Sequence, residues 1–441
     1  MVGYALYIAV SFVLLCLPFL WKTDSIPLID TAFTAISSVT TAGLLTISVA
    51  DDYNILGQFI ILLGVQLGGM GYMTIGSLII IASKGYLPKN RVKIGKAILA
   101  MPGHFDPQRF FKHIAVYALS IELIGALILW VLFSQSGTPD GVSPLWAAIF
   151  HSVCSFCTSG ISVFPNSLEN YADNTAVSLT VALLALLGGI GFIVLEDLYR
   201  ACNTKSFKPT LTTKIILVST FGAVTIGTLL LFFDPHIAEF PIKKRILTAF
   251  FQTVSALTTT GYNTIPVSSL GAATLVIVIV LMLLGASPSG TGGGLKSTTW
   301  SAAIAAIKSF LRGDETITFF GFKVPHGRIT AAFASITLYA ITSLIGVYCL
   351  LLIEITTHDF EYIVFEVVAA LGTAGLSCGI TPNLSVSGKL VIMVLMFVGR
   401  LGVMVFALGA VALYQDISES SSDKDTAAKY EDPPMESDIV L

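Results

Sequence analysis

Eight long apolar stretches constrain this chain more than any other feature of its sequence. They lie at about residues 3–20, 55–82, 113–133, 174–197, 213–233, 270–309, 328–354 and 387–414. A helix needs roughly 20 apolar residues to cross the hydrocarbon core of a bilayer. With 54% hydrophobic and 12% charged residues, the chain also lies far from the balance of water-soluble domains. The sequence therefore predicts an all-α membrane protein with eight transmembrane helices.

Basic residues predict how these helices are oriented. The connections after the even-numbered stretches hold most of the Lys and Arg between the stretches: Lys84, Lys89, Arg91, Lys93, Lys96, Arg109, Lys112, Arg200, Lys205, Lys208, Lys214, Lys308, Arg312, Lys323 and Arg328. The opposite side has Lys22, Lys243, Lys244 and Arg245. Because cytoplasmic loops are enriched in Lys and Arg, we expect both termini in the cytoplasm. This predicts a multi-pass protein of a bacterial-type cytoplasmic (inner) membrane.

One motif, F-x2-[IV]-x4-T-x-G, recurs in the four segments that join each odd-numbered stretch to the next. Its glycines are Gly43, Gly160, Gly261 and Gly375. The phenylalanines ten residues earlier are Phe33, Phe150, Phe251 and Phe365, and the threonines two residues earlier are Thr41, Thr158, Thr259 and Thr373. Small residues that only close helix contacts would explain one copy. Four copies at fixed offsets indicate internal repetition.

The repeat predicts four units, each an outer helix, a pore loop and an inner helix, around a pseudo-fourfold pore. Their predicted bounds are residues 1–83, 113–200, 212–310 and 328–414. Residues 415–441 are polar and mostly acidic, and we expect a disordered cytoplasmic tail there.

The motif segments are too short to cross a membrane, so each is expected to enter and leave on the outer side. A short helix directs the negative end of its dipole into the membrane, where a cation is favoured. The backbone that follows must face water, protein or an ion, and rings of carbonyls can replace the hydration shell of an alkali ion. The predicted potassium-binding filter consists of Thr40, Thr41, Ala42, Gly43, Cys157, Thr158, Ser159, Gly160, Thr258, Thr259, Thr260, Gly261, Gly372, Thr373, Ala374 and Gly375.

The sixth stretch is interrupted by residues 285–294, which cannot form a continuous helix. A phosphate-binding loop would need glycine directly before Lys296, and Leu295 stands there. We expect an intramembrane gate beneath the filter, formed by Gly285, Ser287, Pro288, Ser289, Gly290, Thr291, Gly292, Gly293 and Gly294.

Arg400 lies near the middle of the eighth stretch, where an unpaired charge costs about 2.5 to 3.5 kcal/mol. It has two possible roles: a structural cation that bonds helix-end carbonyls, or a latch that bonds the carbonyls of the interrupting loop. We favour the latch, which makes Arg400 part of the gate.

Taken together, the fourfold T-x-G, the glycine-rich break and the late arginine resemble the Trk/Ktr/HKT superfamily of potassium transporters, specifically membrane (pore) subunits of the KtrB or TrkH type. The resemblance covers nearly everything up to about Tyr414. It implies potassium uptake, with sodium as a candidate activator. It also implies a homodimer and a cytoplasmic ring of nucleotide-binding regulatory subunits of the KtrA or TrkA type. In that superfamily, glycine at all four filter positions accompanies potassium selectivity.

A sodium-coupled or sodium-selective secondary cation transporter is the alternative. Inverted repeats and intramembrane carboxylates would favour it, but these repeats share one topology and their spans carry almost no carboxylates. Clustered His, Asp and Glu within a span are lacking, so we expect no enzyme. We also expect no covalently bound cofactor and no nucleic-acid partner.

Five further residues are assigned no chemical role. Cys154 and Cys157 could form a redox pair, but no second ligand pair accompanies them, and we interpret them as small buried residues. His151 is expected at an interface. Glu196 and Asp197 end the fourth stretch and are expected to be solvated.

Overall fold

The computed structural model describes residues 2–71, 74, 77, 78, 80, 81, 106–139, 141–203, 209–313, 316–319, 322–354 and 357–408. Within them, three helices are long and apolar enough to cross a membrane: α7 (Pro107–Ser136), α11 (Leu211–Phe232) and α16 (His326–Glu354). A fourth span results if α9 (Thr175–Ile190) and α10 (Phe192–Asn203), which meet at a 95° bend, count as one. The predicted tail, residues 415–441, lies outside the described residues.

Four short helices carry the repeated motif: α2 (Leu28–Thr40), α8 (Pro144–Phe156), α13 (Ile242–Leu257) and α17 (Phe360–Gly372). At 13 to 16 residues they are about 20 to 24 Å long, too short for a hydrocarbon core of about 30 Å. The motif phenylalanines of all four are at most 2% exposed. These helices are therefore the buried centre of the bundle.

The helices that follow the motif are interrupted, and this corrects the sequence prediction. They are α4 (Ile55–Met70), α9, α14 (Ala272–Leu284) with α15 (Ser297–Arg312), and α18 (Val386–Leu401). Only the break after α14 was predicted, whereas α4, α9 and α18 also end inside stretches expected to be continuous. Each of these three ends at a glycine with φ between 79° and 84°: Gly71, Gly191 and Gly402. A left-handed residue ends an α-helix, and glycine adopts this conformation without steric cost.

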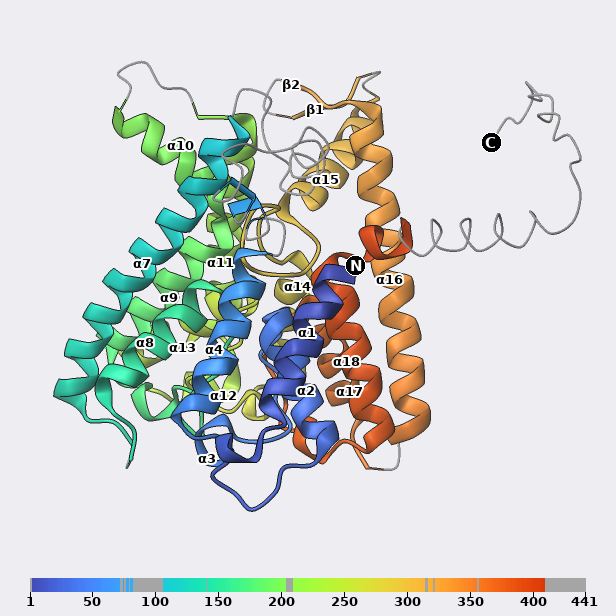
Figure 1. Ribbon diagram of the computed structural model, residues 1–441. Helices are drawn as coiled ribbons and strands as arrows, with labels where there is room; N and C mark the ends of the chain where they lie inside the picture. The colour runs from blue at the N-terminus through green and yellow to red at the C-terminus, as the bar shows by residue number, and fades with distance from the viewer. Residues whose placement is uncertain are drawn as a thin grey trace, which may run out of the picture.

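The remaining elements connect this bundle. The first helix is α1 (Val2–Leu15), and the short helices are α3 (Val49–Asp52) and α12 (Pro235–Ala238). Single 3-10 turns are η1 (Pro18–Leu20), η2 (Glu169–Tyr171), η3 (Val267–Ser269) and η4 (Thr381–Asn383). Strands β1 (Thr318–Phe319) and β2 (Phe322–Lys323) pair antiparallel, with Thr318 opposite Lys323. Helices α10 and α15 and the two strands lie at one end of the bundle, and α3 and α12 lie toward the other (Figure 1).

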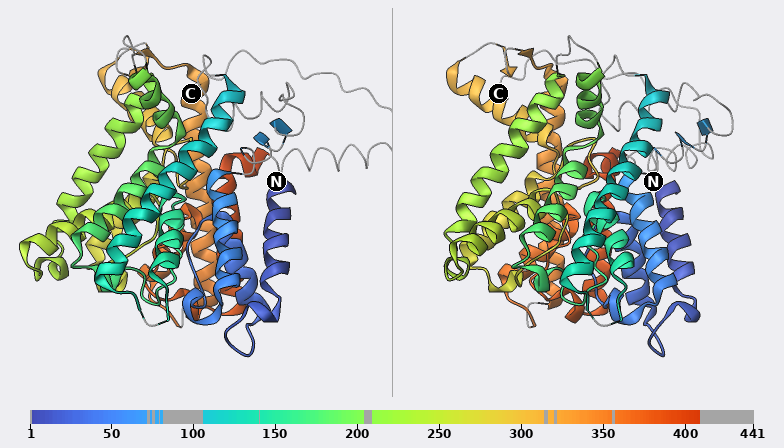
Figure 2. Two further views of the ribbon diagram at one scale, coloured as in Figure 1. Left: turned by 60° about the vertical axis from the view of Figure 1, so that its left-hand side comes forward. Right: turned by 90° about the vertical axis from the view of Figure 1, so that its left-hand side faces the viewer.

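Each motif helix packs between the helices before and after it in the chain: α2 against α1 and α4, α8 against α7 and α9, α13 against α11 and α14, and α17 against α16 and α18. Helix α18 also contacts α2, which joins the last unit to the first. There the Lys389 ammonium lies 2.6 Å from the Asp30 carboxylate, and both side chains are nearly buried. Figure 2 shows the long helices running lengthwise between the two ends.

The outer faces of the long helices are apolar and exposed. Leu119, Leu123 and Ile124 on α7, and Leu344 and Tyr348 on α16, are each more than half exposed. A water-soluble protein rarely leaves so continuous an apolar surface uncovered, whereas lipid covers it without cost. The surface therefore agrees with the membrane protein that the composition predicts.

Several polar residues lie in surroundings that the sequence did not predict. Glu196 and Asp197 are only 4% and 1% exposed, so the prediction of solvated carboxylates is wrong. Glu196 instead binds Arg200 at 2.9 Å and His113 at 2.8 Å. His151 lies in α8 and is fully buried, so the prediction that it lies at an interface is wrong. Both of its ring nitrogens have hydrogen-bond partners inside the protein. Cys154 and Cys157 are buried free thiols, as predicted.

Candidate functional site

All four motif helices end in the same turn. The motif threonines adopt left-handed φ angles of 50°, 51°, 57° and 47° at Thr41, Thr158, Thr259 and Thr373. In each copy the threonine N–H donates to the carbonyl three residues earlier, and the next N–H donates to the carbonyl five residues earlier, at 2.8 to 3.2 Å. This is the Schellman arrangement. A β-branched residue is strained in that conformation, and four such residues at one place are typical of a functional site.

The motif glycines form a closed ring. A Cβ built on each glycine would meet a carbonyl oxygen of the next unit: Gly43 against Ser159 at 2.0 Å, Gly160 against Thr260 at 2.2 Å, Gly261 against Ala374 at 2.5 Å, and Gly375 against Ala42 at 2.8 Å. The fourth contact returns to the first unit. The four backbone segments therefore surround one axis at a separation that excludes any side chain at the glycine positions.

The first residue has a side chain in three of the four predicted filter segments, and these three side chains bond groups behind the ring; the fourth is Gly372. The Thr40 hydroxyl donates to the Ile36 carbonyl at 2.7 Å, and the Thr258 hydroxyl donates to the Val254 carbonyl at 2.7 Å. The Cys157 thiol lies 3.6 Å from a carboxylate oxygen of Glu122. Only the backbone of these residues can therefore line the axis.

The motif threonine hydroxyls have unequal surroundings. Those of Thr41 and Thr373 are buried and have no hydrogen-bond partner in the structure. Those of Thr158 and Thr259 contact the loop between α14 and α15.

The interrupting loop is anchored in the bend between α9 and α10. The backbone N–H groups of Ser287 and Thr291 donate to the carbonyls of Gly189 and Gly188, at 3.0 and 3.1 Å. Ser289 accepts from the first two N–H groups of α10, through its carbonyl at 3.2 Å and its hydroxyl at 3.1 Å. The loop thus satisfies helix-end groups that a break at membrane depth would otherwise leave unpaired.

The same loop lies directly against the inner side of the ring. Thr291 donates to the Phe156 carbonyl at 2.9 Å, and the Gly293 N–H donates to the Thr259 hydroxyl at 2.9 Å. A Cβ on Gly293 would lie 2.3 Å from the Gly372 carbonyl. The glycines of the loop are therefore required by close backbone approach, and the predicted gate residues and filter residues are in contact.

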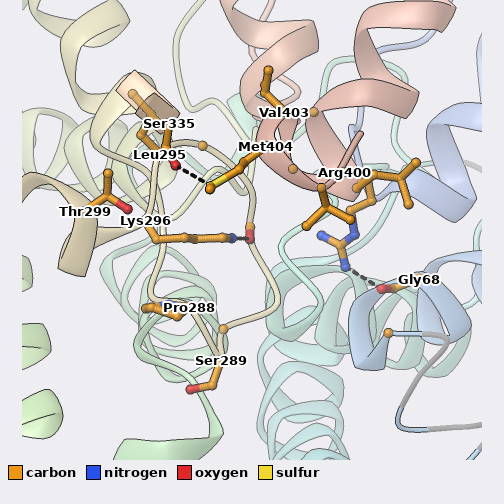
Figure 3. A pocket seen from close by; sticks show the side chains of 18 of the residues that line it. Gly68, Pro288, Ser289, Leu295, Lys296, Thr299, Ser335, Arg400, Val403 and Met404 are labelled. Carbon is orange, nitrogen blue, oxygen red and sulfur yellow. Dashed lines mark hydrogen bonds between the residues drawn. The ribbon is translucent and has the colours of Figure 1, made fainter. Parts of the chain in front are cut away.

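Arg400 holds the loop from the other side. Its guanidinium donates to the carbonyl of Thr291 in the loop. It also donates to the carbonyl of Gly68 near the end of α4 (Figure 3). The sequence left two roles open for Arg400, bonding helix-end carbonyls or bonding the loop, and the structure contains both contacts. Each is a charge-assisted hydrogen bond, the stronger kind in proteins.

A cavity of about 350 Å³ opens below the loop, lined among others by Tyr4, Tyr339, Lys296 and Arg400. Lys296 extends across it, and its ammonium donates to the Gly292 carbonyl at 2.6 Å (Figure 3). Two basic side chains, Lys296 and Arg400, therefore line this cavity. The sequence analysis missed Lys296 as a site residue, although it lies only two residues beyond the predicted loop.

Glu122 is the second residue that the sequence analysis missed. It is 5% exposed on α7, and both carboxylate oxygens accept from the Gln66 amide at 3.0 Å. A carboxylate within an apolar stretch was the available signal. Its contact with Cys157 places it directly behind the second filter segment.

A helical bundle with an apolar outer surface, a central ring of backbone segments and, beneath it, a cavity lined by two basic side chains is typical of membrane transport proteins. A family model described as TrkH, cation transport protein, matches residues 9–421. The chain belongs to this family, and it is therefore a transporter and not an enzyme.

Individual relatives agree with this assignment. The chain is 32% identical over 412 residues to the Ktr system potassium uptake protein B of Bacillus subtilis (strain 168), covering 92% of this chain and 90% of that protein. It is also 32% identical over 420 residues to the potassium/sodium uptake protein NtpJ of Enterococcus hirae, covering 92% and 91%. The crystal structure of the potassium transporter TrkH from Vibrio parahaemolyticus has a similar fold, with a TM-score of 0.71 at 21% identity, covering 92% and 84%.

Proposed function

We propose that this protein takes up potassium across the cytoplasmic membrane through the ring of four T-x-G segments. The observation that carries the proposal is the closed cycle of glycine-to-carbonyl contacts between successive units. Four backbone segments around one axis can replace the hydration shell of an alkali ion with carbonyl oxygens. The names of the relatives, which are potassium or potassium/sodium uptake proteins, support the choice of ion.

The proposed architecture is eight membrane passes in four units, with bounds at residues 1–83, 113–200, 212–310 and 328–414. The four identical helix ends and the packing of each motif helix between its own neighbours support it. Three of the inner helices would then cross as two segments joined at Gly71, Gly191 and Gly402. Residues 1, 72, 73, 75, 76, 79, 82 and 83 of the first unit, residue 140 of the second, and residues 355, 356 and 409–414 of the fourth lie outside the described part of the chain.

The loop at residues 285–294 is the proposed gate, and Arg400 is its latch. The loop lies under the ring, and the two hydrogen bonds of Arg400 tie it to α4. A cation cannot pass while backbone atoms of Gly292 and Gly293 lie against the filter carbonyls. Opening therefore requires the loop to move, and breaking the Arg400 contacts is the smallest change that frees it.

Orientation and partners follow from the same assignment. The end that holds α10, α15 and the strand pair carries Lys308, Arg312 and Lys323, so we place it in the cytoplasm. Both termini are then cytoplasmic. The resemblance to Trk and Ktr membrane subunits supports a homodimer in the bilayer and a regulatory ring of nucleotide-binding subunits on that side.

A sodium pathway is the second candidate. The name of the Enterococcus relative includes sodium, and the ring is not fourfold symmetric in its side chains, with Ser159 and Thr260 where the other units have alanine. Unequal segments can hold ions of different size less selectively than four equal ones. Sodium as a second cargo or an activator is therefore the competing outcome of the test.

The test is rubidium uptake into potassium-loaded proteoliposomes of the purified protein, with sodium and lithium measured in parallel. We expect rubidium uptake well above sodium uptake. A matched control is Gly160→Val, because its Cβ would lie 2.2 Å from the Thr260 carbonyl and distort the ring. Equal or greater sodium uptake would favour the second candidate. Uptake that is the same in Gly160→Val would reject the ring as the pathway.

A further inference from the structure

The residue after the motif phenylalanine is polar and buried in all four units. These residues are Thr34, His151, Gln252 and Glu366, and none is more than 1% exposed. A buried polar side chain is costly unless it is hydrogen-bonded, so each should have a specific partner. The second and fourth units share one kind of partner, which the first and third units lack.

In the second and fourth units the partner is a serine two residues beyond the filter glycine. The Ser162 hydroxyl lies 2.9 Å from Nε2 of His151, and the Ser377 hydroxyl donates to a carboxylate oxygen of Glu366. The other carboxylate oxygen of Glu366 accepts from Thr381 at 2.9 Å. In these two units, residues at the same motif positions thus join the motif helix to the outgoing backbone, which is the segment that follows the filter glycine.

Both serines are held in the same way on their other side. The Phe164 N–H donates to the Ser162 hydroxyl at 2.9 Å, and the Gly379 N–H donates to the Ser377 hydroxyl at 2.9 Å. Each hydroxyl therefore accepts from the backbone two residues ahead and directs its own hydrogen at the motif helix. In the second unit this assignment requires Nδ1 of His151 to carry the hydrogen, which agrees with its 2.8 Å contact to the Ala147 carbonyl.

The first and third units lack this link. The first has Leu45 at the serine position, and the Thr34 hydroxyl donates to the Asp30 carbonyl of its own helix at 2.9 Å. In the third, Asn263 is held by the second unit, because its N–H donates to the Ser167 hydroxyl at 3.2 Å. The Gln252 amide reaches a carbonyl only at 3.4 Å, beyond the usual range.

Order around the ring places the second and fourth units opposite each other, because the glycine contacts run from unit to unit in sequence. Each serine follows its glycine by two residues, about 7 Å of extended chain, so a displaced serine would displace the filter carbonyls. Ion selectivity depends on the positions and stiffness of those carbonyls.

From this geometry we propose that His151 and Glu366 are positioning residues, which brace the filter segments of two opposite units through Ser162 and Ser377 and thereby set the discrimination between potassium and sodium. The inference rests on the proposed function. It assigns no role to these side chains as ion ligands. This brace acts along one diagonal of the ring. In the third unit a different bond, from the Ser255 hydroxyl to the Tyr262 carbonyl at 2.6 Å, joins the motif helix to the outgoing backbone.

The test compares rubidium and sodium uptake in proteoliposomes for Ser162→Ala, Ser377→Ala and Glu366→Gln. We expect the rubidium-to-sodium ratio to fall about threefold or more, since even part of the free energy of one buried hydrogen bond amounts to such a factor. Ser377→Thr keeps the hydroxyl and should restore the ratio. The matched control is Thr34→Val, which removes a hydroxyl from the same motif position in a unit without the link.

Unchanged ratios in both serine variants would overturn the inference, as would an equal loss in Thr34→Val, which would indicate general packing. If Glu366→Gln does not fold, the serine variants on the opposite end of each link still decide the matter. If the wild type takes up rubidium selectively and the serine variants keep the same rubidium-to-sodium ratio, only this inference is refuted. A wild-type protein that moves no alkali ion refutes the proposed function, and the inference with it.

Discussion

Replacing Arg400 by glutamine should open the proposed gate. The guanidinium donates two hydrogen bonds, to the loop carbonyl of Thr291 and to the Gly68 carbonyl of α4. A hydrogen bond to a charged group contributes about 1.5 to 3 kcal/mol, so the loss of both weakens the closed arrangement by about 3 kcal/mol or more. Since 1.4 kcal/mol is about a factor of ten, the closed-to-open ratio falls on the order of a hundredfold.

Initial rates of rubidium uptake into proteoliposomes measure this shift. We expect the rate of Arg400→Gln to exceed that of the wild type by about tenfold or more, because glutamine can keep at most one of the two contacts. Arg400→Lys distinguishes the effect of the two hydrogen bonds from the effect of the positive charge. It keeps the charge but not the paired donors, and should raise the rate less.

The matched control is Arg328→Gln, which removes an exposed arginine near the N-terminal end of α16. Its rate should equal that of the wild type. An Arg400→Gln protein that is folded, by thermal unfolding, and that transports no faster than the wild type would refute the latch. A decrease in rate would instead indicate that the arginine stabilises the conducting state.

Three other perturbations test separate parts of the structure. Deleting residues 289–293 removes the loop from beneath the ring and should raise rubidium uptake, whereas an unchanged rate would argue against a gate there. Gly43→Ser places a Cβ 2.0 Å from the Ser159 carbonyl, so we expect slower rubidium uptake and a larger sodium share; an unaltered ratio would contradict the ring geometry. Asp30→Asn leaves Lys389 nearly buried without its partner and should cost about 3 kcal/mol of stability, seen as a lower unfolding temperature in detergent. An unfolding temperature equal to that of the wild type would mean that this ion pair does not hold the first and last units together.

Much of the architecture is readable from the sequence because it depends on short windows. Apolar stretches of membrane length and the fourfold motif are local or periodic features, and they predicted the buried motif helices and the glycine-rich loop. The structure has positive φ at all eight motif threonines and glycines; for the threonines this conformation was not predicted. Selectivity for potassium stays a prediction.

Other features depended on contacts between residues far apart in the chain. Breaks at Gly71, Gly191 and Gly402 were not predicted, because glycine is tolerated inside a helix at a cost of about 1 kcal/mol and only the surrounding bundle decides whether the helix ends there. The partners of Glu196 and His151 were missed for a related reason. A polar residue in an apolar stretch can be solvated or bonded, and only its neighbours in space distinguish the two.

The sequence by itself thus determined that this chain enters a membrane, that it contains four related units, and which backbone segments are special, since hydrophobicity and backbone preference belong to individual residues and their near neighbours. Only the tertiary structure decided that the Gly375 segment returns to the Ala42 carbonyl and that Arg400 joins Thr291 to Gly68. These are contacts between residues a hundred or more positions apart, and they form only when the packing of the whole bundle brings the two partners within hydrogen-bonding distance.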